Sequence, residues 1–314
     1  CSPGLREPSL SDPAFAAAVH ARLQALARTQ GPDRPLFYNL GDETGIADLA
    51  APWDYDTSPA SLAVFRTWLR GQYPDLDALN RQWATTFPDW DAVTPELTDD
   101  AMRRTDQNFS AWADFKAWMD VSFANAIHAS TGALHAADPA ALSAIEGAQV
   151  PGWGGYDYGR LAGAVDVMEI YDTGNALQLA RAFNPALIPL GTAFASGPRE
   201  VHRAWRDLLR GGRGMVVWDE AGDVIGPDGA AGPRGQFLQS LVSSLRAGSP
   251  ALRPPSRCCI PTPASAPAGC WTCSPRAPPG PTATPSARTT TTPGVPRAAR
   301  PSRTCRSSAS PHDG

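Results

Sequence analysis

The chain has 314 residues, of which 42% are hydrophobic, enough to bury one or two cores, and no stretch resembles a membrane span. Its net charge of −4 is unevenly distributed along the chain. Residues 248–314 hold eight arginines and one acid, which leaves 19 basic and 30 acidic residues in the body of the chain, residues 1–247. An acidic body argues against nucleic acid as a ligand, so we expect neither a nucleic-acid partner nor a membrane partner.

The first predicted unit is a helix followed by a strand. Asp12 precedes Pro13 at a helix start, and apolar residues then recur at helical spacing until Gly31. The apolar run 36–40 is too short for a helix and carries two aromatic residues, which favours a buried strand. An acidic pair follows this run, so we expect two carboxylates at its carboxyl end, although an exposed turn would give the same pattern.

Residues from about 48 to 137 are predicted to form a helical insert. Helix starts are indicated at Ser58 and at Asp75, and a long helix is expected from about residue 109 to 137. One stripe of this long helix is apolar and aromatic, which is more typical of core packing than of a cofactor site; it holds Trp112, Phe115, Met119, Phe123 and Ile127.

After residue 138 the chain alternates regularly between strands and helices. Strands are predicted at 142–146, 165–171, 187–194 and 215–218, and helices at 156–164, 176–183, 199–209 and 236–245. With the strand at 36–40 this makes five strands, each followed by a helix, which implies a parallel sheet. The predicted fold class is α/β, a partial (β/α)8 TIM barrel that lacks its first three strands. An open doubly wound sheet would also fit, but its usual glycine-rich phosphate turn is absent after the first strand.

Acids near the strand ends are the candidate catalytic residues. A retaining glycosidase needs two carboxyl groups about 5 Å apart. Glu43 is the first candidate, and for the second we favour Glu169 ahead of Glu146, because alternation places Glu169 and Tyr171 on one face of their strand. A tyrosine hydroxyl on that face would hold the nucleophilic carboxylate. The structural alternatives are a Glu146 satisfied by backbone donors and a Glu169 paired with Arg181.

Other polar and aromatic residues at strand ends are candidate substrate contacts, because an aromatic face can stack on a sugar ring. They are Asp42, Trp153, Tyr171, Asp172, Trp218 and Asp219. Four histidines fall within predicted helices without a second ligand at metal spacing, and we interpret them as structural; they are His20, His128, His135 and His202. We expect no metal and no organic cofactor.

Two aromatic segments resemble a known family. Residues 65–73 read FRTWLRGQY, residues 79–87 read LNRQWATTF, and Trp90 follows. This spacing resembles the segment after the fourth strand of bacterial β-galactosidases of glycoside hydrolase family 42. The resemblance extends over roughly residues 11–247 and is looser after the aromatic segments. It implies a (β/α) barrel whose fourth strand carries the acid/base glutamate, which by position is Glu43.

The chain also departs from that family's pattern. The family's acid/base follows an asparagine, whereas Asp42 precedes Glu43 here. The family's nucleophile closes the seventh strand, but the matching stretch 188–192 has no carboxylate. The cysteine cluster that often holds zinc is also missing, since residues 51–61 contain no cysteine. The second carboxylate must therefore come from another strand or be absent.

The resemblance implies a retaining glycoside hydrolase that acts on β-galactoside-type oligosaccharides, with a carbohydrate as its partner. We expect residues 1–247 to be the C-terminal part of the barrel catalytic domain, inactive alone as a fragment. One alternative is a carbohydrate-binding barrel relative without catalysis, and another is a nucleotide-binding doubly wound domain.

Residues 248–314 form the last predicted segment, a disordered tail rich in Pro, Arg, Ser and Thr. A natural linker and an out-of-frame translation both fit this composition; we favour the second, because the segment holds five of the six cysteines. Cys270 and Cys273 have metal-motif spacing without the strand and helix context. The chain begins at Cys1 and no signal-peptide pattern precedes its first helix, and we expect a fragment at both ends. For the full-length protein we expect a cytoplasmic location, with an upstream signal peptide as the alternative, and a homo-oligomer.

Overall fold

The computed structural model describes residues 6–46, 54–149, 156–171, 175–219 and 222–248. All of them lie in the first of two units of the chain, Cys1–Pro250. The second unit, Ala251–Gly314, holds most of the predicted tail and lies outside the described residues. In the described part of the chain, none of the helices combines the length and the apolar character needed to cross a membrane.

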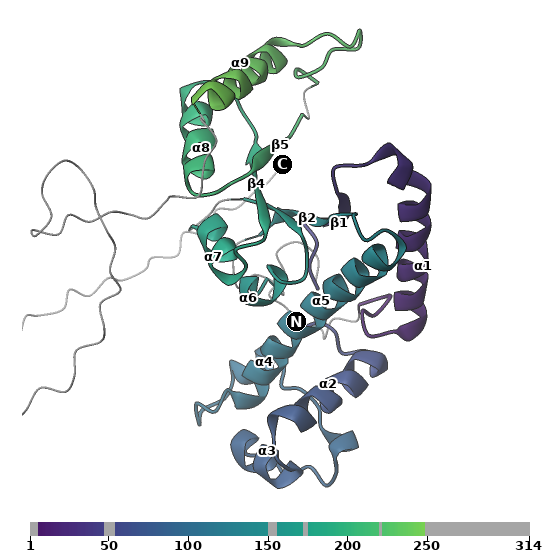
Figure 1. The fold of residues 1–314 in the computed structure, drawn as a ribbon. Helices are drawn as coiled ribbons and strands as arrows, with labels where there is room; N and C mark the ends of the chain where they lie inside the picture. Colours follow the sequence, from purple (N-terminus) through teal and green to yellow (C-terminus); the bar gives the residue numbers. More distant parts are fainter. Residues whose placement is uncertain (1–5, 47–53, 150–155, 172–174, 220–221, 249–314) are drawn as a thin grey trace, which may run out of the picture. The chain divides into compact units, whose positions relative to one another are not determined.

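A five-stranded parallel sheet organises the fold, with its strands in the order of the sequence (Figure 1). The strands are β1 (Tyr38–Asp42), β2 (Ser143–Ala148), β3 (Val167–Ile170), β4 (Ile188–Ala193) and β5 (Gly214–Val217). The sequence predicts all five, and their regular alternation with helices is that of consecutive units of a (β/α)8 barrel. The α/β class and the partial-barrel architecture are confirmed.

The start of the first strand differs from the prediction. The apolar run indicated a strand over 36–40, whereas β1 begins at Tyr38 and ends at Asp42. Its first ladder bonds run to β2, where the amide of Tyr38 donates to the Leu142 carbonyl at 2.7 Å. Leu36 lies before this pairing, and its side chain is 79% exposed. Apolar character alone therefore placed the strand two residues too early.

Helices follow the strands as the sequence predicts. The helices around the sheet are α1 (Pro13–Gln30), α6 (Tyr158–Leu161), α7 (Ala176–Phe183), α8 (Pro198–Leu209) and α9 (Pro233–Gly248), and a 3-10 turn η1 (Gly31–Asp33) follows α1. The carboxylate of Asp12 accepts the amide of Ala14 at 2.9 Å and caps α1, with Pro13 in the first turn. Capping chemistry thus fixes where this helix begins.

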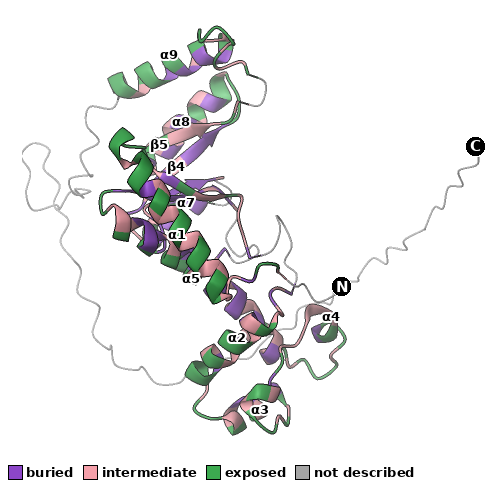
Figure 2. Ribbon diagram, turned by 90° about the vertical axis from the view of Figure 1, so that its right-hand side faces the viewer, coloured by how far each residue is buried: buried purple, intermediate pink, exposed green. Residues whose placement is uncertain are grey.

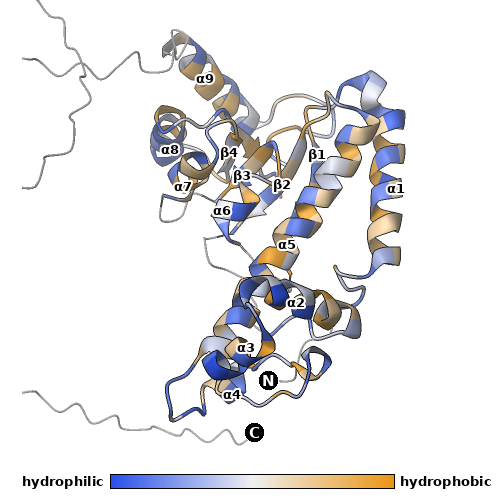
Figure 3. Ribbon diagram, turned by 60° about the horizontal axis from the view of Figure 1, so that its bottom comes forward, coloured by the Kyte–Doolittle hydropathy of each residue, from blue (hydrophilic) through white to orange (hydrophobic). Residues whose placement is uncertain are grey.

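The long helix α5 (Ser110–Ala137) belongs to two hydrophobic cores. Its middle contributes Met119, Phe123 and Ile127 to the core of the sheet, where they join buried residues of β2, β3, α6 and α7. Helix α1 runs alongside α5 (Figures 1 and 3). Burial on the sheet and along one side of α5 is visible in Figure 2. Both faces of β3 are buried, as expected for a parallel strand.

The first half of α5 packs against the helical insert. The insert contains α2 (Pro59–Gln72), α3 (Leu76–Trp83), the 3-10 turn η2 (Trp90–Ala92) and α4 (Thr98–Ala101). Its aromatic core joins Phe65 and Trp83 from the insert to Phe115 and Trp118 from α5. Four of the five stripe residues are therefore core, as the sequence predicts, whereas Trp112 is half-buried and donates a hydrogen bond to Thr98 at 3.0 Å.

Candidate active site

Four carboxylates lie at or near the carboxyl ends of three neighbouring strands. Asp42 is the last residue of β1, Glu43 follows it, Glu146 lies in β2 and Glu169 lies in β3. The parallel pairing sets Asp42 opposite Glu146. Because the carboxyl ends of parallel strands meet at one edge of the sheet, these side chains share one rim. The sequence predicts this grouping, and the catalytic role of its members stays a prediction.

Glu43 is held by contacts with two other strand ends. Its backbone has φ of 45°, in the left-handed region that residues with side chains rarely adopt. Its amide donates to the carbonyl of Glu146 at 3.0 Å, which continues the ladder beyond β1. The hydroxyl of Tyr171, just after β3, donates to Oε1 of Glu43 at 2.8 Å. The sequence predicts a tyrosine that supports a carboxylate, but the described carboxylate bonded to this hydroxyl is Glu43.

Gly147 in β2 lies between the two leading candidates. Its φ of 61° is in the left-handed region, and its amide donates to Oε2 of Glu169. A Cβ atom on Gly147 would stand 2.5 Å from Cγ of Glu43 and 2.9 Å from Oδ1 of Asp42. Since real Cβ atoms essentially never approach that closely, only glycine leaves room for the Glu43 side chain here.

Glu169 is the most deeply buried of the four acids. Only 2% of its surface is exposed, and its Oε1 atom has no hydrogen-bond partner among the described residues. Burial raises its pKa to about 7, the charges of Glu146, Asp42 and Glu43 act in the same direction, and the Gly147 amide opposes them. The alternative pairing with Arg181 is not present, since the guanidinium of Arg181 donates to the carbonyl of Arg210. Glu169 therefore titrates close to neutral pH.

Glu146 makes a different set of contacts. Nδ2 of Asn39 donates to its Oε2 at 2.6 Å, and Oδ1 of Asn39 accepts the amide of Gly41 at 2.9 Å. Burial, and then the charge of Asp42, raises the pKa of Glu146. Glu146 therefore links β2 to the irregular end of β1 by a hydrogen bond. Its donor is the side chain of Asn39, whereas the alternative from the sequence was a set of backbone donors.

Tyr156 is a buried residue whose ionisation depends on the acids of the site. Its ring packs against Phe123, with centroids 5.6 Å apart. Burial raises its pKa, and the charges of Glu43 and Asp42 raise it further. Its position at the start of a predicted helix gave no signal of this effect.

Aromatic side chains extend the rim along β3 and β4. The rings of Tyr171 and Phe194 lie 5.6 Å apart, and the guanidinium of Arg203 lies 5.6 Å from the Phe194 ring centroid. Phe194 is 46% exposed, directly after β4. Strand β4 and its end carry no carboxylate, in agreement with the sequence. The stretch 188–192 that matches the family's nucleophile position thus lies within β4, and an exposed ring follows the end of that strand.

The remaining predicted contacts lie after β5 or outside the described residues. Trp218 is 50% exposed, and its carbonyl accepts a hydrogen bond from Arg234. Asp219 accepts the amides of Asp223 at 3.0 Å and Val224 at 3.3 Å. Burial raises the pKa of Asp219, but these amide bonds outweigh that effect and hold it below its ordinary value. Asp219 thus stabilises its own loop. The predicted contacts Trp153 and Asp172 lie outside the described residues.

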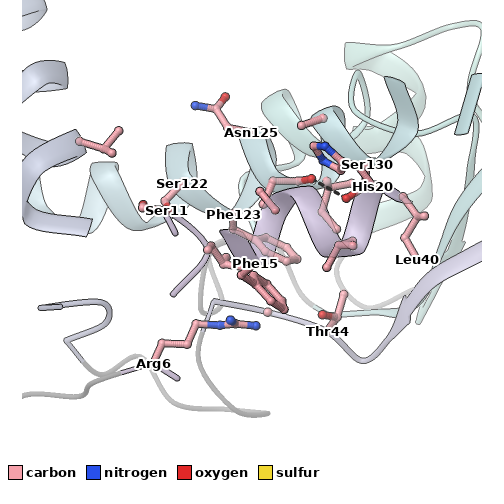
Figure 4. Close-up of a pocket in the computed structure, with 18 of the residues that line it drawn as sticks. Arg6, Ser11, Phe15, His20, Leu40, Thr44, Ser122, Phe123, Asn125 and Ser130 are labelled. Atoms are coloured by element: carbon pink, nitrogen blue, oxygen red, sulfur yellow. Dashed lines mark hydrogen bonds between the residues drawn. The ribbon is translucent and has the colours of Figure 1, made fainter. Parts of the chain in front are cut away.

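A cavity of about 340 Å³ lies beside α1, α5 and the end of β1 (Figure 4). Phe15 and Phe123 lie at its centre, and Arg6 extends toward them. Leu40 and Thr44 contribute from the first strand and the turn after it, but none of the four carboxylates is among the residues that line it. His20 also lines the cavity, but the paired carboxylates that a glycosidase needs lie on the acidic rim. Among the described residues, no group of three metal-ligating side chains is placed to hold a metal ion.

Solved structures of glycoside-cleaving proteins share this fold at low sequence identity. The catalytic domain of β-amylase from Paenibacillus polymyxa has a TM-score of 0.55 and 15% identity, covering 74% of this chain and 69% of that one. The β-galactosidase from Bacillus circulans sp. alkalophilus has a TM-score of 0.58 and 16% identity, covering 76% and 40%. The β-galactosidase from the psychrophilic Marinomonas ef1 has a TM-score of 0.59 and 13% identity, covering 77% and 44%. The chain thus spans less than half the length of either β-galactosidase.

Sequence comparison assigns the family. A search of curated protein sequences found no significant match. The family model for beta-galactosidases of glycoside hydrolase family 42 matches residues 10–179, which is more than half of the chain and includes β1, β2 and β3. The chain belongs to the beta-galactosidase family of glycoside hydrolases, family 42.

Proposed function

We propose that the protein is a retaining glycoside hydrolase that cleaves β-galactoside-type oligosaccharides with Glu43 and Glu169. The observation that carries this proposal is the connection between the two carboxylates: Gly147 donates to Glu169 and makes room for Glu43, while Tyr171 donates to Glu43. Two carboxyl groups held near each other by fixed donors are what the double-displacement reaction requires. Membership of the family supplies the substrate class.

The proposed roles follow the position of each acid. Glu43, at the end of the strand that carries the family's acid/base, protonates the leaving glycosidic oxygen while Glu169 attacks the anomeric carbon. Glu43 then removes a proton from water, and the water displaces Glu169 from the covalent glycosyl intermediate. The exposed rings of Phe194 and Trp218 offer faces on which a sugar could stack. Asp42, exposed beside Glu43, and Tyr171 offer polar groups to sugar hydroxyls.

The raised pKa of Glu169 predicts a pH dependence of the reaction. Burial keeps Glu169 protonated up to about pH 7, and only an ionised carboxylate attacks. We therefore expect kcat/KM to change with pH through an apparent pKa near 7. One proton on the pair gives the same pH profile on either carboxyl, so this pKa shows that Glu169 belongs to the pair, and azide rescue assigns the two roles.

A second function is favoured by one observation. Strand β4 ends at Ala193 and carries no carboxylate, whereas the resemblance to the family implies a nucleophile at the end of this strand. A barrel relative that binds galactosides without cleaving them would have this arrangement. Calorimetry distinguishes the two: galactoside binding at a full-length protein that forms no product supports the binding protein, and turnover supports the enzyme.

Azide rescue tests the proposed enzyme and its roles together. The full-length protein is prepared with Glu169→Gly and, separately, with Glu43→Gly, and each is given an aryl β-galactoside and sodium azide. A missing nucleophile leaves room for azide on the α face, so Glu169→Gly should form α-galactosyl azide. A missing acid/base lets azide attack the covalent intermediate, so Glu43→Gly should form β-galactosyl azide. Exchanged products would reverse the roles, and two variants with wild-type turnover would refute the pair.

A further inference from the structure

Gly147 has an unusual combination of contacts for a strand residue. Its amide is a donor to Glu169, the space beside its Cα is occupied by the side chain of Glu43, and the carbonyl before it accepts the amide of Glu43. Three strand ends therefore meet at one residue. The sequence pattern around Gly147 predicts none of these contacts.

The strand ladders are irregular on both sides of this residue. The register of β1 against β2 shifts between Asn39 and Asp42, and that of β2 against β3 shifts between Ile145 and Ala148. Register irregularities of this kind turn side chains away from their regular positions and are frequent next to active sites. Here the second shift contains Gly147 itself, and the first ends at the residue before Glu43.

We propose that Gly147 is a positioning residue that fixes the separation of Glu43 and Glu169, by binding one carboxylate through its amide and admitting the other through its missing side chain. This inference rests on the proposed function, because the two carboxylates matter to catalysis only if they form the catalytic pair. Gly147 touches neither substrate nor the reacting atoms in this account and acts through the two glutamates.

The two contributions of Gly147 depend on different properties. The left-handed backbone turns the amide toward Glu169, and asparagine could adopt that conformation at modest cost. The space beside Cα requires glycine, because any Cβ would stand 2.5 Å from Cγ of Glu43. A substitution should therefore displace Glu43 even where the backbone is retained.

The first test uses the unaltered chain, labelled with ¹⁵N, and follows the Gly147 amide proton by NMR from pH 5 to 9. The amide donates to a carboxyl whose pKa is about 7, so its resonance should shift with a midpoint near pH 7 and lie furthest downfield when Glu169 is ionised. The Glu169→Gln variant should abolish this titration. A Gly147 amide that does not titrate, or one that titrates equally in Glu169→Gln, would overturn the proposal.

The second test compares Gly147→Ala with Gly229→Ala. Gly229 has a φ of 78° with open space around its Cα, so the control introduces similar backbone strain without a collision. In the full-length enzyme, Gly147→Ala should lower kcat by about 100-fold or more and leave KM nearly unchanged. It should also shift the apparent pKa of kcat/KM that is assigned to Glu169. Gly229→Ala should change neither kcat nor this apparent pKa. Equal effects of both variants, in folded proteins, would contradict the proposal.

The outcomes for Gly147 and for the proposed function are separable. If Gly147→Ala does not fold, the amide titration of the unaltered chain still decides whether the hydrogen bond exists. If that titration is found and the full-length protein cleaves no galactoside, the proposed function fails while the contact between Gly147 and Glu169 stands, and the positioning role in catalysis is refuted with it.

Discussion

At the scale of single residues, the two oxygens of Glu169 have different environments. One oxygen accepts a backbone amide, and the other has no partner among the described residues. A buried acceptor without a donor destabilises the charged form, which is why the pKa of Glu169 rises to about 7.

Replacing Glu169 by glutamine should remove catalysis and leave the fold. Glutamine keeps the size of the side chain and an acceptor for the Gly147 amide, but it is a far weaker nucleophile, so kcat should fall at least about 10³-fold. Glu96→Gln is the matched control, because Glu96 pairs with Arg104 at 2.8 Å in the helical insert. Steady-state assays should show less than about a threefold change for the control, and a Glu169→Gln enzyme with near-normal turnover would refute the role.

Replacing Tyr171 by phenylalanine should weaken the hold on Glu43. A hydrogen bond contributes about 0.5–1.5 kcal/mol, so kcat/KM should fall by about 2- to 10-fold with little change in the melting temperature. The hydroxyl of Tyr73 donates to Asp114 in the helical insert, and Tyr73→Phe should reduce stability without lowering kcat/KM. Similar kinetic losses in both variants would show that Tyr171 acts through stability alone.

The residue contacts were only partly predictable. The end of each apolar strand predicted where the acids would lie, because parallel strands end at one edge. Alternation placed Glu169 and Tyr171 on one face, but the partner of Tyr171 depends on how β1, β2 and β3 align, and both ladders contain a register shift. A sequence pattern does not reveal such register shifts, so it gave no indication that Tyr156 and Gly147 are linked to the acids.

At the scale of elements, α5 joins the sheet to the helical insert. It contributes Phe115 and Trp118 to the aromatic core, and Met119, Phe123 and Ile127 to the core of the sheet. Helical periodicity predicted α5 and the surrounding helices to within a few residues, because caps such as Asp75 mark their starts. The strand β1 was displaced by two residues, because pairing with β2, and not hydrophobicity, decides where it begins.

The aromatic core should show the energetics of a close-packed cluster. Phe65 is fully buried against Trp68, Trp83, Phe115 and Trp118. Phe65→Ala should therefore lower the free energy of unfolding by about 3–5 kcal/mol in urea denaturation. The adjacent Val64 is partly exposed, and Val64→Ala should change the same quantity by less than about 1 kcal/mol. Comparable losses at both positions would contradict this packing.

At the scale of the whole molecule, the buried acids make stability depend on pH. The pKa of Glu169 rises from an ordinary 4.5 to about 7, and burial and the charge of Asp157 raise that of Asp120 from 3.8 to about 6. Between those values the folded state retains protons that the unfolded state has released, so the free energy of unfolding should fall as pH rises from about 4.5 to 7.

The Glu169→Gln variant isolates the share of that dependence that belongs to one group. Glutamine has no proton to lose, so the difference in unfolding free energy between pH 5 and pH 8 should be smaller in the variant. The unfolding free energy of the variant should rise relative to that of the wild type mainly at pH 8. Urea denaturation at the two pH values measures it. The same pH difference in both proteins would show that Glu169 ionises near its ordinary pKa.

The most direct test of the central claim, that Glu169 is the nucleophile of a retaining galactosidase, is covalent trapping. The full-length protein is incubated with 2,4-dinitrophenyl 2-deoxy-2-fluoro-β-galactoside, whose fluorine slows hydrolysis of the glycosyl intermediate, and the labelled peptide is sequenced by mass spectrometry. We predict one fluorogalactosyl group esterified to Glu169 and no labelling of the Glu169→Gln variant. A label on Glu43, on Glu146 or on a residue of another strand would contradict the claim.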